Sequence, residues 1–143
     1  MPLNPSRHAG PLTLAVVGRQ AAGAAADSSD RRRNYAIVRD GALIGGVGIS
    51  GIVRWPLESA NVGVHVDSAL RGQGIGTAAL GLACELAFGD LALHRLEAGA
   101  QPTNHASLTM IRRNGFTEIG LAPGSLFVDG AWRDHMLFQK LAP

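Results

Sequence analysis

The segment RGQGIG, residues 71–76, stands where a strand-like run gives way to a helix-forming run. Residues 61–67 alternate apolar and polar side chains, which predicts a half-buried strand. The apolar spacing over residues 74–89 predicts a helix. Glycines at this junction allow positive φ and leave the amides at the start of the helix uncovered. Together with the helix dipole and Arg71, these amides suit an anion such as a diphosphate.

The rest of the chain predicts a mixed α/β fold, of the α+β type, in a single domain spanning residues 1–143. Further strands are expected at 35–38, 43–52, 94–101, 116–121, 126–128 and 132–141, and further helices at 15–26 and 104–114. Asp-Gly pairs predict two of the connections to be hairpin turns. Residues 1–11 contain three prolines and are expected to be disordered.

Composition excludes several classes of function. The formal net charge of +2 is too small to indicate a nucleic-acid partner. No apolar run approaches the roughly 18 residues that a membrane span needs. The single cysteine, Cys84, lies in an apolar helical run, so we expect it to be buried in a protein of a reducing compartment. The apolar run LTLAVV is short for a secretory signal, and a cytoplasmic protein is the working expectation.

Two phosphate-binding motifs compete with a plain glycine turn for the 71–76 segment. A Walker A loop is excluded, because it needs a lysine and the only lysine is Lys140. Gly74, Gly76 and Ala79 fit the dinucleotide pattern G-x-G-x-x-A, and Glu97 follows about 20 residues later. In that fold, however, the strand runs almost directly into the first glycine, whereas here DSALRGQ intervenes. The remaining chain is also too short for the second half of a doubly wound sheet.

The segment RGQGIG after an alternating strand resembles the acetyl-CoA pyrophosphate loop of the GNAT acetyltransferases, whose pattern is Q/R-x-x-G-x-G/A. The stretches LHRLEAGAQPTNHASLTMIRRNGF and VDGAWRDHMLF are similar to the branch that contains the ribosomal-protein N-terminal acetyltransferases. The resemblance covers residues 35–141. It implies a GNAT fold, acetyl-CoA as co-substrate, an amine acceptor and no metal.

The resemblance also implies a set of CoA contacts. They are Val64, Val66, Arg71, Gly72, Gln73, Gly74, Ile75, Gly76, Asn104 and Ser107. The loop amides would hold the diphosphate, and the strand would pair with the pantetheine arm. Asn104 would hold the pantetheine, and Ser107 would be catalytic by donating a proton to the CoA sulfur. For both residues, helix capping is the structural alternative.

The sequence departs from the family where a catalytic base is expected. Many relatives carry a carboxylate where Asn61 stands, aromatic residues at Val64 and His65, and a tyrosine near Ser125. None of these is present, so the usual base and any tyrosine acid are in doubt.

His65 is the catalytic base that we expect instead. It lies on the strand face opposite the valines, next to the expected thioester, and an imidazole accepts protons near neutral pH. The alternative is a packed histidine that fills the space of a lost aromatic residue. Glu58 and Asp67 are weaker candidates, and His135 is interpreted as a structural residue of the last hairpin.

A second departure concerns the N-terminal region. Relatives begin with a strand and a helix before the matched region, and this chain has only residues 1–10 and one predicted helix there. The first strand and helix are therefore either missing or replaced. If the strand is missing, a sheet edge is uncovered, and a homodimer formed through that edge becomes a hypothesis.

The sequence thus predicts an acetyl-CoA-dependent N-acetyltransferase that acts on the N-terminal amine of a protein or peptide. A small-molecule amine such as an aminoglycoside is an alternative acceptor. A non-catalytic acyl-CoA binding module is the alternative of a different class.

Overall fold

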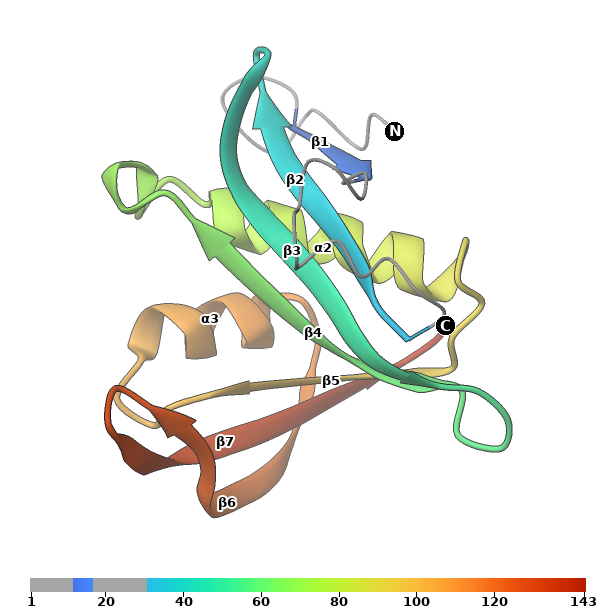
Figure 1. Cartoon of the computed structure of the whole chain (residues 1–143), viewed down its shortest axis with the longest axis vertical. Helices are drawn as coiled ribbons and strands as arrows, with labels where there is room; N and C mark the ends of the chain where they lie inside the picture. The colour runs from blue at the N-terminus through green and yellow to red at the C-terminus, as the bar shows by residue number, and fades with distance from the viewer. Residues whose placement is uncertain (1–11, 17–30) are drawn as a thin grey trace.

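A seven-stranded sheet with two helices forms the part of the chain that the computed structural model describes, residues 12–16 and 31–143 (Figure 1). The strands follow the order β1-β2-β3-β4-β5-β7-β6. Their bounds are β1 Leu12–Val16, β2 Arg33–Arg39, β3 Ala42–Val53, β4 Ser59–Val66, β5 Arg95–Ala100, β6 Thr117–Val128 and β7 Ala131–Leu141; the helices are α2 Ile75–Phe88 and α3 His105–Arg113. This α+β architecture confirms the predicted fold class.

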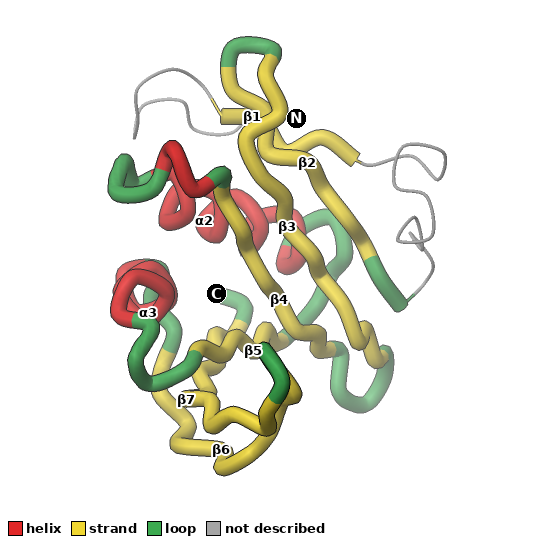
Figure 2. The backbone as a smooth tube through the Cα atoms, turned by 60° about the vertical axis from the view of Figure 1, so that its left-hand side comes forward, coloured by secondary structure: helices red, strands yellow, loops and turns green. Residues whose placement is uncertain are grey.

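The sheet is nearly divided in two between β4 and β5. These two strands are parallel and share three residue pairs, from Ser59–Arg95 to Asn61–Glu97. Every other neighbouring pair of strands is antiparallel. Beyond Asn61 the strands diverge, and residues 62–66 of β4 have no β5 partner in the described part of the chain (Figure 2). Half of β4 therefore offers an open backbone edge inside the molecule.

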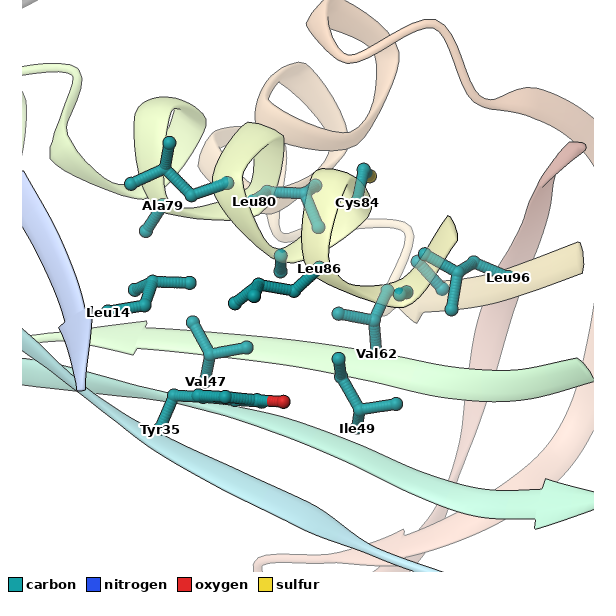
Figure 3. Packing of buried hydrophobic residues seen from close by; sticks show 14 of the residues in the cluster. Leu14, Tyr35, Val47, Ile49, Val62, Ala79, Leu80, Cys84, Leu86 and Leu96 are labelled. Atoms are coloured by element: carbon teal, nitrogen blue, oxygen red, sulfur yellow. The ribbon is translucent and has the colours of Figure 1, made fainter. Parts of the chain in front are cut away.

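The core lies between the strands and α2. Val47, Ile49 and Val62 face Leu80 and Leu86 across this layer (Figure 3). Alternation along the strands places these apolar side chains on one face, as the sequence of β4 predicts. Burial of each large aliphatic side chain contributes about 1.5 to 3 kcal/mol to stability. Within the described residues, no helix is both long and apolar enough to cross a membrane.

The first strand corrects the predicted helix over residues 15–26. Ala15 belongs to β1, which pairs antiparallel with β2, and Leu14 lies opposite Ile37. Leu12 and Leu14 are each only 2% exposed, so burial of alternate side chains prevails over the helix propensity of the alanines. The edge of β2 is thus covered by a strand, contrary to the alternative in which the first strand is missing. The rest of the predicted helix, and the predicted disorder of residues 1–11, lie outside the described residues.

The last hairpin differs from the prediction in one respect. The strands predicted at 116–121 and 126–128 form the single strand β6, with register shifts against β7. Asp134 explains why the strand continues past Pro123, because its Oδ1 accepts a hydrogen bond of 2.8 Å from the Gly124 N–H. His135 contacts the Arg133 carbonyl oxygen through Nδ1 at 3.2 Å.

Candidate functional site

The loop before α2 presents backbone amides. Gly72 and Gly74 have φ of 81° and 76°, in the left-handed region that favours glycine. Gly74 is the N-cap of α2, and no side chain caps the helix. The first amides of α2 are therefore available to an anion. Gly76 has a different reason for being glycine: an added Cβ would lie 3.1 Å from Met110 Sδ, so its absence lets α3 approach α2.

A cavity of about 610 Å³ lies between the open part of β4, the start of α2 and one side of α3. Every predicted site residue except Gln73 lines it: Val64, His65, Val66, Arg71, Gly72, Gly74, Ile75, Gly76, Asn104 and Ser107. The Gln73 side chain instead accepts a hydrogen bond from Arg39 Nη1 at 3.5 Å. The fold thus brings together residues that are distant in the sequence, while their individual roles stay predictions.

The sequence analysis did not identify most of the wall that α3 contributes. The additional lining residues are Leu70, Thr77, His105, Ala106, Thr109, Met110 and Arg113. Ala106, Met110 and Arg113 recur at helical spacing, which is the signal that could have revealed this wall. Arg113 adds a second cation to Arg71, and no Asp or Glu is among the described residues that line the cavity.

Two asparagines fix α3. Asn104 Oδ1 accepts a hydrogen bond of 3.2 Å from the Ser107 N–H. Asn104 therefore caps the helix, which is the structural role that the sequence analysis gave as the alternative to a CoA contact. Asn114 Nδ2 donates to the Thr77 carbonyl at 3.0 Å and to the Met110 carbonyl at 2.9 Å. The bond from Asn114 to Thr77 joins α3 to α2, and residues of both helices line the cavity.

His65 stands at the boundary between the cavity and the other face of the sheet. It lines the cavity, yet its ring lies over Gly46 of β3: a Cβ on Gly46 would be 2.6 Å from His65 Cε1. The weaker base candidates are engaged elsewhere. Glu58 forms an ion pair with Arg54 at 3.3 Å, and Asp67 accepts a hydrogen bond from the Ala69 N–H at 3.1 Å. Neither of them lines the cavity.

A second cavity, also of about 610 Å³, lies along α2 and includes Leu12, Cys84 and Lys140. It holds none of the predicted site residues and no helix start. Burial raises the pKa of the Cys84 thiol to about 11, so the sulfur stays protonated and weakly nucleophilic near neutral pH. Cys84 is 4% exposed, which confirms the predicted burial. The described residues contain no group of three or more side chains suited to a metal ion.

Comparison with known proteins gives a consistent result. The family model for the acetyltransferase (GNAT) domain matches residues 6–117. The chain is 38% identical over 104 residues to a probable N-acetyltransferase, YjcK, of Bacillus subtilis, an alignment that covers 73% of this chain and 58% of the relative. It is 31% identical over 101 residues to the [ribosomal protein uS5]-alanine N-acetyltransferase of Escherichia coli, covering 71% of this chain and 52% of the relative. The chain thus spans a little over half the length of these relatives.

Solved structures show the same fold. RimJ of Mycobacterium smegmatis, in complex with CoA-disulfide, superposes with a TM-score of 0.77 at 36% identity, covering 86% of this chain and 57% of RimJ. A spermidine N-acetyltransferase, SpeG, of Vibrio cholerae has a TM-score of 0.80 at 17% identity, covering 92% of this chain and 94% of SpeG. At that identity, the second likeness concerns the fold alone.

Proposed function

The chain belongs to the GNAT acetyltransferase family, and on this premise we propose that it transfers the acetyl group of acetyl-CoA to the N-terminal amine of a protein or peptide. One observation carries the proposal: the open edge of β4 and the uncapped start of α2 border the same cavity. A strand edge suits an amide-containing arm, and a helix start suits phosphates.

The charges of the cavity fit acetyl-CoA. Arg71 and Arg113 line it, and no carboxylate of the described residues does, so a polyanionic co-substrate meets only favourable charges. The amides that follow Gly74 would hold the diphosphate, and residues 62–66 of β4 would pair with the pantetheine. Acetyl-CoA supplies an activated acetyl group; the chain supplies its orientation.

Two side chains are proposed for the chemistry. The amine nitrogen forms a bond to the acetyl carbon while the carbon–sulfur bond breaks, so one proton leaves the amine and one reaches the sulfur. His65 would accept the first proton, since it lines the cavity and also reaches the opposite face of the sheet. The Ser107 hydroxyl, on the α3 wall, would donate the second.

A protein or peptide N-terminus is the acceptor that the relatives support. The Escherichia coli relative is named for acetylation of an alanine of ribosomal protein uS5, and it is 31% identical to this chain over 101 residues. A small amine stays the second candidate acceptor on the sequence analysis alone, since SpeG at 17% identity is evidence of the fold only.

A thiol-release assay tests the proposal. Acetyl-CoA is offered with peptides that begin with alanine or serine, with spermidine, and with no amine. We expect CoA release that depends on the peptide, together with a peptide mass increased by one acetyl group. CoA release with spermidine but not with the peptides would identify a small amine as the acceptor. CoA binding without turnover on any amine would favour the non-catalytic binding module. A His65→Ala variant with an unchanged pH profile would exclude His65 as the base.

A further inference from the structure

The sheet face opposite α2 is lined by small side chains next to the proposed site. Residues paired directly across antiparallel strands share a face, so Asn34, Gly48 and Gly63 form one row across β2, β3 and β4. Gly46 and His65 form the adjacent row. Gly63 is exposed, and within the described part of the chain a Cβ placed on it would meet nothing within 4 Å. An acceptor can therefore lie directly on this backbone beside His65.

Arg32 lies across this row. Its Nε donates to Asn34 Oδ1 at 3.2 Å, and a Cβ added to Gly48 would be 3.7 Å from its Nη2. The guanidinium thus rests over Gly48, one strand away from Gly63. Arg32 is exposed and forms no ion pair with another residue of the described chain. Among the described residues its Nη1 and Nη2 have no hydrogen-bond partner, and a guanidinium with unused donors suits a carboxylate.

Two carboxylates close to this face are already paired. Glu97, which lies opposite Asn61 where β4 and β5 meet, forms an ion pair with Arg95 at 2.9 Å. Glu58 is paired with Arg54. Asp67, which follows His65 by two residues, forms no ion pair within the described chain, so Arg32 acts through its own row and not through a net positive charge of the whole face.

The spacing of strands gives the reach of Arg32. Gly48 lies on β3, and the gap where the amine would attack lies beyond β4, about 7 to 10 Å away at one and a half to two strand spacings. His65 lies two residues further along β4 than Gly63, which adds about 6.6 Å along the strand, so the separation is about 10 to 12 Å. An extended peptide advances about 3.3 Å per residue, so this distance spans three to four residues. We infer that Arg32 is a specificity-determining residue that selects acceptor peptides with an acidic side chain at the third or fourth position. The inference rests on the proposed N-terminal acetyltransferase function.

The experiment compares peptides that begin with alanine and carry Asp, Asn or Lys at the third or the fourth position. For the wild-type protein, we expect kcat/KM to be about fivefold higher with Asp than with Asn, the effect of one partly exposed charge pair. Lys should lower kcat/KM further. Arg32→Gln should remove the difference between Asp and Asn, and Arg32→Glu should reverse the order of Asp and Lys. High salt should shrink the preference for Asp, because the pair is exposed.

Arg133→Gln serves as the matched control, since it removes the same charge from the distant last hairpin. It should keep the preference for Asp, and both Gln variants should bind CoA as the wild type does in calorimetry. Equal kcat/KM for Asp and Lys peptides, or an Arg32→Gln variant that keeps the preference, would overturn the role of Arg32 while leaving the acetyltransferase activity in place. Absence of transfer to every peptide would instead overturn the proposed function.

Discussion

Ser107 shows how one residue can serve both the helix and the proposed chemistry. Its N–H donates a hydrogen bond to Asn104 Oδ1, and the residue also lines the cavity. Capping uses the backbone of Ser107 and the side chain of Asn104 only. The two roles can therefore be separated by substitution, because alanine keeps the N–H and loses the hydroxyl.

We predict that Ser107→Ala lowers kcat by about 100-fold or more, the effect typical of losing a general acid. CoA affinity should stay within about twofold, because the helix cap is intact. Stopped-flow or steady-state thiol release measures the first quantity and calorimetry the second. Ser68→Ala, in the 3-10 turn that precedes the loop, is the control and should change neither. Equal losses of turnover and binding would reassign Ser107 to a structural role.

At the scale of elements, the 71–76 loop contains glycines with two distinct physical reasons. Gly72 and Gly74 are favoured by positive φ, and Gly76 lies close to Met110. A sequence motif does not distinguish these two causes, because it shows neither the backbone angle nor the contact with a distant residue. The loop was predicted correctly as a strand-to-helix junction, whereas the packing of α3 against it depends on a contact between distant segments.

Gly74→Val should abolish measurable CoA binding, because a branched side chain would stand at the uncapped start of α2. The substitution also strains the backbone at φ 76°, at a cost of about 1 to 2 kcal/mol. Gly130→Val is a matched control, since Gly130 has φ 80° in the last hairpin turn and lines no part of the cavity. Calorimetry with CoA and thermal unfolding of both variants separate the two effects. Retained CoA affinity in Gly74→Val would contradict the assignment of the loop.

The helices and most strands could be predicted from the sequence because their signals are local. The alternation in β4 and the apolar spacing of α2 need no knowledge of the rest of the chain. The first strand was not predicted, because it is stabilised by pairing with β2, which is distant in the sequence. The alanine-rich sequence that follows it favours a helix. The sequence predicted two strands, 116–121 and 126–128, where the structure has the single strand β6. This prediction was wrong for a similar reason, because Asp134 of β7 accepts a hydrogen bond from the Gly124 N–H.

At the scale of the whole described structure, the sheet consists of two half-sheets that meet at three residue pairs. One half, β1 to β4, carries His65 and the open strand edge; the other, β5 to β7, supports α3 with Ser107 and Arg113. The predicted site residues are divided between these halves. A local pattern predicted the loop, and the resemblance to the GNAT family supplied Asn104 and Ser107, whereas the open edge arises only from the divergence of β4 and β5.

Because the cavity borders both parts, CoA should slow amide hydrogen exchange in both. We predict protection of residues 62–66 of β4, the first turn of α2 and the first turn of α3 when CoA is saturating. Saturation at 100 times Kd stabilises the folded state by about 2.7 kcal/mol, so the melting temperature should also rise. Exchange followed by mass spectrometry measures the effect, with β6 as the internal control. Protection confined to α2 would show that the strand edge takes no part in binding.

The divergence of β4 from β5 also bears on how the protein behaves in a crowded cell. Unpaired strand backbone readily recruits a strand from another molecule, which is the first step of aggregation. CoA bound at this edge would block pairing with a strand of another molecule. Bound CoA would then also reduce aggregation. Protein made where CoA is scarce would aggregate more readily.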